Sequence, residues 1–286
     1  IKKKRPVFLW GPPGIGKSEL VESVGKEMNA LVIDLRMALM DPTDIRGVGF
    51  YNPGTNVMDW APPVDLPSAE LAAQYEHVIL FFDEMNSAPP AVQAASYQLV
   101  LNRRVGQYVL PDNVSIIAAG NRETDKGVTY RMPTPLANRF IHVEMRADFE
   151  AWLDWAVNNN IHEDVVGYLS FAKQDLYDFD AKSSSRAFAT PRSWTFVSEL
   201  LNDADGDDDT FTNLVAGTVG EATKSAYSQL RGDNMVPVKS ALGQHENPAK
   251  NLDSSIVSQC IENATLAPNS SNMQLWEFHH ITSSSI

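Results

Sequence analysis

The stretch Gly11-Pro12-Pro13-Gly14-Ile15-Gly16-Lys17-Ser18 decides the fold of this chain. It matches the pattern G-x-x-x-x-G-K-[ST], and it lies between the apolar run Val7–Trp10 and the helix-forming segment Glu19–Met28. In such a strand, loop and helix, backbone N–H groups and the helix N-terminus surround a polyphosphate. We therefore expect residues 11–19 to bind a nucleotide, with Lys17 on the β- and γ-phosphates and Ser18 as a ligand of Mg²⁺.

A second apolar run, Val78–Phe82, delivers Asp83 and Glu84 at its carboxyl end. A continuous apolar run is typical of a strand that is buried on both faces of a parallel sheet. Open α/β sheets bind ligands at the carboxyl ends of their strands. We therefore expect Asp83 to hold Mg²⁺ through water and Glu84 to polarise the attacking water.

A third apolar run, Val114–Ala119, ends at Gly120 and Asn121. An amide both donates and accepts hydrogen bonds, so Asn121 can contact the γ-phosphate and the lytic water. Further along, Arg139 precedes the alternating segment Ile141–Glu144. Taken alone, Arg139 favours an ordinary surface salt bridge.

A new helix is expected to begin after Thr190, with Thr190 as N-cap and Pro191 at the first helical position. Arg192 follows directly. In this order, the motifs resemble the AAA+ superfamily, most closely its MoxR-like (dynein-related) branch, over about residues 1–232. The resemblance implies that Asn121 is sensor 1, that Arg139 is an arginine finger acting on a neighbouring subunit's nucleotide, and that Arg192 is sensor 2. Arg186 is an alternative to Arg192.

Arg131 is a second candidate for an arginine at the subunit interface. The fold class expected is α/β: a phosphate-loop αβα parallel sheet over residues 1–147, a small helical lid over 148–232 and a tail over 233–286. Apolar residues at helical spacing support the lid. They occur in 149–157, 165–172, 194–201 and 214–230.

Residues 41–63 form a Pro- and Gly-rich segment that is expected to be irregular. Long loops of this kind inside compact domains are usually functional. The resemblance implies the family's insert in helix 2, which points toward the central axis of a ring, where Phe50, Tyr51 and Trp60 could grip a client protein. A packed Ω-loop that covers the sheet is an equal alternative. Residues 103–109 predict a β-hairpin that turns at Gly106 and Gln107.

Composition limits the classes of function. The chain has 286 residues, 43% of them hydrophobic, and no uninterrupted apolar segment of membrane-spanning length, so a soluble protein is expected. Its single cysteine, Cys260, and the absence of a visible secretory signal favour the cytoplasm. A formal net charge of −13 argues against a general nucleic-acid surface.

The tail resembles part of another family. Its segment Ala267–Ile281 is similar to the N-terminal part of the nitroreductases, in which Ser270, Asn272 and Gln274 would help to bind FMN and Trp276 would pack. About 50 residues bury too little surface to build such a site alone. We therefore interpret the tail as an incomplete fragment that binds no FMN. A C-terminal extension of the chain's own family that merely looks similar is the alternative.

These observations predict a remodelling ATPase that hydrolyses ATP with Mg²⁺. The resemblance implies a homo-oligomeric ring, with a hexamer as the expected form. It also implies a protein client or a metalloenzyme under maturation, and a partner with a von Willebrand factor A domain. Two alternatives stay open: a small-molecule kinase with a phosphate loop, and a nucleic-acid-dependent motor.

Overall fold

The computed structural model describes residues 5–125, 129–180, 182–183, 185–202, 208–220, 223 and 227. Within them the chain forms two compact units. The first contains residues 5–12 and 17–145, and the second contains residues 13–16 together with the described residues from 146 onward. None of the helices in the described ranges is long and apolar enough to cross a membrane.

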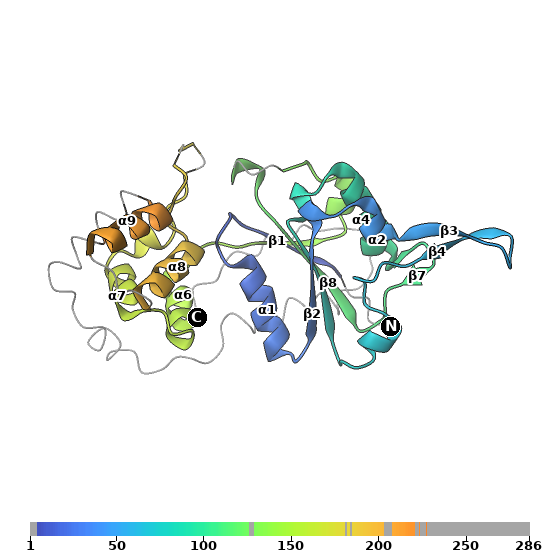
Figure 1. The fold of residues 1–286 in the computed structure, drawn as a ribbon, viewed down its shortest axis with the longest axis horizontal. Coiled ribbons are helices and arrows are strands. Elements are labelled where there is room, and N and C mark those ends of the chain that lie inside the picture. The colour runs from blue at the N-terminus through green and yellow to red at the C-terminus, as the bar shows by residue number, and fades with distance from the viewer. Residues whose placement is uncertain are drawn as a thin grey trace. The chain divides into compact units, whose positions relative to one another are not determined.

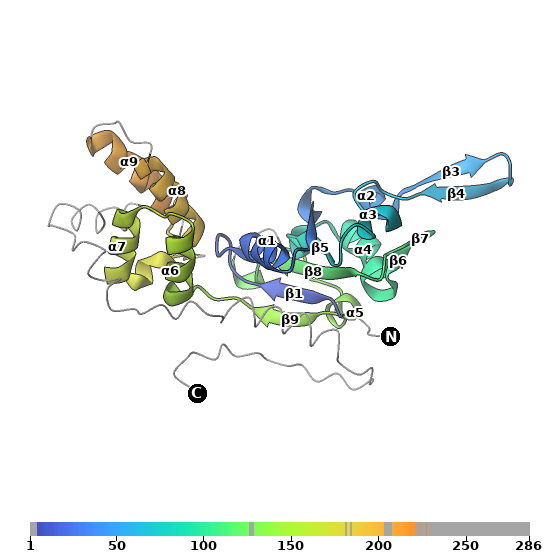
Figure 2. The same ribbon diagram turned by 90° about the horizontal axis from the view of Figure 1, so that it is seen from below.

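The first unit is built on a parallel sheet in the order β2-β5-β8-β1-β9 (Figures 1 and 2). Its strands are β1 (Val7–Trp10), β2 (Leu31–Arg36), β5 (Val78–Asp83), β8 (Val114–Gly120) and β9 (Ile141–Glu144). All strands expected from apolar runs are present, and β5 and β8 are the most deeply buried. Because all five strands run parallel, their carboxyl ends meet at one edge of the sheet.

Helices of the first unit cover both faces of this sheet. They are α1 (Lys17–Glu27), α2 (Pro42–Arg46), α3 (Ala69–Ala72), α4 (Pro90–Asn102) and α5 (Thr134–Ala137). On one face, Val21 of α1 packs with Phe81 and Ile117. On the other, Val92 and Leu99 of α4 belong to the cluster that buries the remaining strand side chains. The αβα fold predicted from the sequence is therefore confirmed.

Residues 48–61 form an ordered antiparallel ribbon, so the expectation of an irregular segment is wrong. The ribbon consists of β3 (Val48–Asn52) and β4 (Val57–Ala61), and it projects away from the sheet (Figures 1 and 2). Tyr51 and Met58 lie opposite each other, and both are more than 60% exposed. This exposure excludes an Ω-loop packed over the sheet.

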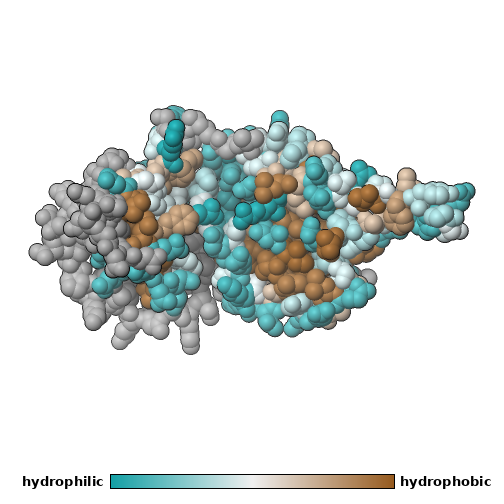
Figure 3. Space-filling view, in the orientation of Figure 1, coloured by the Kyte–Doolittle hydropathy of each residue, from teal (hydrophilic) through white to brown (hydrophobic). Residues whose placement is uncertain are grey.

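The predicted hairpin at residues 103–109 is confirmed. Its strands, β6 (Arg104–Val105) and β7 (Tyr108–Val109), pair antiparallel around Gly106 and Gln107. At the base of the ribbon, Arg46 lies over the ring of Trp60, 5.8 Å from its centroid. Figure 3 shows apolar colour along the inner part of the ribbon and hydrophilic colour at its tip.

The second unit is helical. Its helices are α6 (Phe149–Asn158), α7 (Glu163–Phe171), α8 (Pro191–Asn202) and α9 (Asp208–Val219). Their buried side chains, among them Trp152, Leu169 and Trp194, form a core of their own. The predicted helix start is confirmed, because the Ser193 backbone N–H donates to Thr190 Oγ1 at 3.0 Å.

Candidate nucleotide site

The candidate site lies at the carboxyl edge of the sheet. The register pairs Trp10 of β1 with Gly120 of β8, and the next residues along these strands are Gly11 and Asn121. A hydrogen bond from the Gly11 N–H to the Gly120 carbonyl, 3.2 Å long, continues this pairing past the strands. Asp83 ends β5, the other neighbour of β8. Three separate apolar runs thus bring their polar ends to one edge, as the sequence predicted.

Lys17 is held against this edge. Its ammonium Nζ donates to the carbonyl oxygens of Gly11 at 2.8 Å and Pro12 at 3.0 Å, and to Asn121 Oδ1 at 2.9 Å. An ammonium group has three donors and no acceptor. Lys17 therefore sits between the start of the phosphate loop and Asn121, on acceptors that an anionic phosphate oxygen could replace.

Ser18 and Asp83 are directly paired. The Ser18 hydroxyl donates to Asp83 Oδ2 at 2.9 Å. Hydroxyl and carboxylate oxygens are the donors that Mg²⁺ prefers, together with water and phosphate oxygens. No group of three or more His, Cys, Asp or Glu side chains in the described part of the chain could hold a metal ion. The oxygens of Ser18 and Asp83 therefore fit an ion that takes its remaining ligands from nucleotide and water.

Glu84 has an unusual backbone. It is exposed and lies in the left-handed region, with φ 53° and ψ 34°. Its N–H donates to Asp83 Oδ1 at 2.9 Å. The backbone therefore bends sharply between Asp83, which ends β5, and Glu84. Left-handed non-glycine residues are uncommon and concentrate at functional sites. The bend separates Asp83, which contacts Ser18, from the exposed Glu84.

Asn86 is a functional candidate that the sequence analysis missed. Its side chain is 2% exposed and clamps the main chain of Asn121: Nδ2 donates to the Asn121 carbonyl at 2.6 Å, and Oδ1 accepts from the Asn121 N–H at 3.2 Å. A Cβ at Gly120 would lie 2.2 Å from Asn86 Oδ1. Glycine at position 120 therefore makes room for the clamp. No sequence signal distinguishes this buried amide from a surface one.

We predict that Asn86→Leu lowers kcat for ATP hydrolysis about 10- to 100-fold, because small displacements of a positioned group have effects of that size. The free energy of unfolding should also fall, by about 1–3 kcal/mol, since the Asn121 main chain loses buried partners. Gly120→Ala should have the same kinetic effect by displacing the Asn86 amide. Gln93→Leu removes another buried amide, on α4, and should alter stability alone. A kcat of Asn86→Leu as high as that of Gln93→Leu would contradict the clamp.

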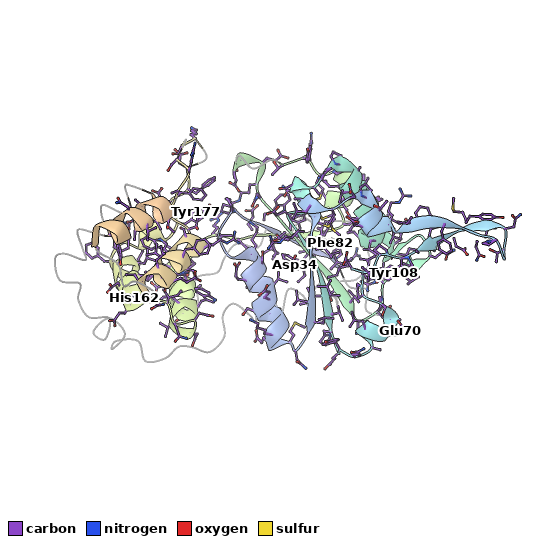
Figure 4. All side chains as sticks on the ribbon, in the orientation of Figure 1. Asp34, Glu70, Phe82, Tyr108, His162 and Tyr177 are labelled. Carbon is purple, nitrogen blue, oxygen red and sulfur yellow. The ribbon has the colours of Figure 1, made fainter. Side chains whose placement is uncertain are left out.

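Asp34 adds negative charge beside the site (Figure 4). It lies on β2, whose neighbour in the sheet is β5. Partial burial raises the pKa of Asp34, and the charge of Asp83 raises it further. A cation bound at Asp83 would offset this repulsion.

The tip of the phosphate loop, Pro13–Gly16, belongs to the second unit. Gly14 has φ +75°, and a Cβ there would lie 2.8 Å from Thr190 Oγ1. The Arg192 backbone N–H donates to the Gly14 carbonyl at 3.3 Å. The main chain of Arg192 thus contacts the loop tip, whereas Arg186 is exposed on the segment before α8. The sensor 2 role of either arginine stays a prediction.

The other loop positions differ in conformation and exposure. Gly16 has φ +95°, a conformation that glycine adopts without strain. Gly11 and Pro12 are buried, Pro13 and Ile15 are partly exposed, and Glu19 is exposed in the first turn of α1.

Arg139 lies at the opposite end of the strands from the candidate site, near their amino-terminal ends. It precedes β9, and the register pairs Ile141 with Val7 at the start of β1. Three further residues, about 10 Å of extended strand, separate that level from the end of β1, where the loop begins. Arg131 lies elsewhere, beside Tyr130, whose N–H donates to the Asn86 carbonyl at 2.7 Å. The two arginines that are candidates for the subunit interface, Arg139 and Arg131, therefore lie at different ends of the sheet.

The nitroreductase-like positions Ser270, Asn272, Gln274 and Trp276 lie outside the described residues. The prediction that this segment is an incomplete fragment that binds no FMN is not tested by the described residues.

Residues 6–140 match the AAA domain family of the dynein-related subfamily. This part of the chain, with its parallel sheet and phosphate loop, is therefore similar to AAA domains of the dynein-related type. Midasin from Giardia intestinalis is 25% identical over 177 residues, which cover 59% of this chain and 4% of that protein. The chain thus spans only a small fraction of the length of this relative. Neither match is a nitroreductase.

Two solved structures are also similar. A candidate ATPase from Cytophaga hutchinsonii has 15% identity and a TM-score of 0.40, with 93% of this chain and 85% of that chain covered. NtrX from Brucella abortus has 17% identity and a TM-score of 0.44, with 75% of this chain and 50% of that chain covered.

Proposed function

We propose that this chain is a Mg²⁺-dependent ATP-hydrolysing remodelling ATPase of the MoxR-like kind. The observation that carries the proposal is the pair of contacts at the carboxyl edge: Lys17 with Asn121, and Ser18 with Asp83. Phosphoryl transfer to water depends on positioning and charge neutralisation more than on covalent chemistry. The residues at this edge supply both.

The roles divide among the side chains at this edge. Lys17 binds phosphate oxygens once it exchanges its carbonyl partners for them. Ser18 and Asp83 hold Mg²⁺, which neutralises phosphate charge when bound. The exposed carboxylate of Glu84 orients and polarises the attacking water. The side-chain amide of Asn121, whose main chain Asn86 clamps, aligns that water with the γ-phosphate.

We further propose that copies of the chain assemble into a ring, with a hexamer as the expected form. Arg139 lies at the edge of the sheet away from its own phosphate loop, which supports action on a neighbouring subunit's nucleotide. Arg131 lies near the clamp on Asn121 and suits that role less. A partner with a von Willebrand factor A domain and a protein client follow from the MoxR-like resemblance.

A phosphate-release assay with ATP, Mg²⁺ and no acceptor tests the reaction. Steady turnover that stops on chelation supports an ATPase. Turnover only with an added small-molecule acceptor would support a kinase instead. Strong stimulation by DNA or RNA would support a nucleic-acid motor, which the net charge of −13 disfavours.

We predict that the ribbon contacts the client. Tyr51→Ser with Met58→Ser removes two exposed apolar side chains from one ribbon face, so basal ATP hydrolysis should change less than about twofold, as is usual for surface substitutions. Stimulation of hydrolysis by a reduced, carboxymethylated α-lactalbumin should be lost. Val64→Ser, at a residue 94% exposed outside the ribbon, is the matched control. Equal stimulation of both proteins would contradict this assignment.

A further inference from the structure

His142, the second residue of β9, is hydrogen-bonded at both ring nitrogens. The Trp10 indole N–H donates to His142 Nδ1 at 2.8 Å, and His142 Nε2 lies 2.8 Å from the Ala137 carbonyl oxygen. An indole N–H can only donate, so Nδ1 must accept. The ring proton therefore lies on Nε2 and is donated to Ala137, which fixes the tautomer.

The two partners of His142 belong to different functional segments. Trp10 is the last residue of β1 and directly precedes the phosphate loop. The Ala137 carbonyl also accepts from the Phe140 N–H at 3.1 Å, which closes a four-residue turn with Arg139 in third position. The imidazole thus bridges the strand that leads into the loop and the turn that carries the predicted arginine finger.

Aromatic side chains pack closely around the hydrogen bonds of His142. Phe8 stacks on Trp10 with centroids 4.2 Å apart, and Phe8 meets Phe140 edge-on at 5.3 Å. The rings of Trp10 and His142 are nearly parallel, with centroids 5.9 Å apart. A packed chain of rings and hydrogen bonds is the kind of network through which a small shift at one end reaches the other.

We propose that His142 is a positioning residue that couples the chain's own phosphate loop to the turn bearing Arg139. A shift of Trp10 when nucleotide enters or leaves the loop moves the imidazole, and the imidazole moves the Ala137 carbonyl. The position of Arg139, which acts on the neighbouring subunit, thereby depends on the nucleotide that is bound in its own subunit. This inference rests on the proposed function, since it assigns a neighbour to Arg139.

Nitrogen NMR of ¹⁵N-histidine-labelled protein tests the bridge within one chain. The His142 signals, assigned by their absence in His142→Gln, should show an unprotonated Nδ1 and a protonated Nε2. They should shift between the ADP-bound and nucleotide-free states. Trp10→Phe keeps a stacking ring but removes the indole donor, so the nucleotide-dependent shift should be lost. A shift of unchanged size in Trp10→Phe would overturn the proposal.

Hydrolysis in mixed assemblies tests the action on the neighbour. His142→Leu should bind ATP normally and show a kcat lowered about 10- to 100-fold. His142→Gln retains a donor for Ala137 and should recover part of that loss. Glu84→Gln subunits should bind ATP without hydrolysing it and carry an intact finger turn, so adding them to His142→Leu subunits should restore activity. His77→Leu, at a side chain that is 40% exposed, should behave as wild type.

The outcomes separate this inference from the proposed function. Wild-type kcat in His142→Leu would overturn the inference, as would mixtures that stay inactive although Arg139→Ala mixtures recover. In the second case His142 would act on its own loop alone. Full activity of Arg139→Ala would instead refute the proposed finger, and the NMR experiment would still report whether loop and turn are linked.

Discussion

Lys17→Ala should lose ATP binding, whereas Glu84→Gln should bind ATP and lose its hydrolysis. In the proposed mechanism Lys17 contacts ground-state phosphates, and a hydrogen bond to a charged group contributes about 1.5–3 kcal/mol, or about 10- to 100-fold in affinity. In the same mechanism Glu84 acts on water only as the reaction proceeds, so its loss should lower kcat about 10²- to 10⁴-fold and leave affinity nearly unchanged. Titration with a fluorescent ATP analogue and a phosphate-release assay measure the two quantities.

Two matched variants control for charge and folding. Lys26→Ala removes an exposed lysine from the last turn of the same helix, and Glu76→Gln removes an 87% exposed carboxylate near the start of β5. Both should retain binding and turnover. An equal loss of ATP affinity in Lys17→Ala and Glu84→Gln would refute the division of roles.

The sequence predicted the three central strands of the sheet because their signals are local. Each central strand is a continuous apolar run followed by a chemically distinctive residue, as in Val78–Phe82 before Asp83. The phosphate-loop motif then limits how these strands can be arranged, since it is compatible with few folds. The positions of Lys17, Asp83 and Asn121 at one edge follow from parallel strands and required no knowledge of tertiary contacts.

The ribbon was missed because its signals conflict. Gly and Pro residues between 41 and 63 indicate loop, whereas Phe50, Tyr51 and Trp60 favour strand. Alternation does not resolve the conflict, because a two-stranded ribbon exposed on both faces has no polar side. Such a segment is read as irregular from composition alone.

The contacts that orient the site could not be predicted. Asn86 lies 35 residues from Asn121 in sequence, and Trp10 lies 132 residues from His142. Each pair meets only because β8 or β9 is placed beside a particular neighbour. A sequence motif indicates which residues are expected to contact the nucleotide. The residues that position them, such as Asn86, are brought into contact only by the arrangement of the strands in the sheet.

Arg139→Ala should bind ATP normally and hydrolyse it about 10³- to 10⁵-fold more slowly, the largest effect expected of any variant. An arginine finger neutralises charge that develops only in the transition state, so its removal leaves ground-state binding intact. Arg139 precedes β9 at the edge of the sheet away from its own loop, which favours action on the neighbour. Single-turnover hydrolysis and nucleotide titration measure the two properties.

Mixed assemblies decide whether Arg139 acts across a subunit boundary. Lys17→Ala subunits cannot hydrolyse ATP but still carry Arg139, and Arg139→Ala subunits have intact phosphate loops. A ring of both should therefore recover part of the activity, because each intact loop can meet a neighbour's finger. Arg131→Ala, combined with Lys17→Ala in the same way, tests the other arginine. If mixtures stay as inactive as either parent while native mass spectrometry shows mixed rings, Arg139 does not act on the neighbour and Arg131 becomes the candidate.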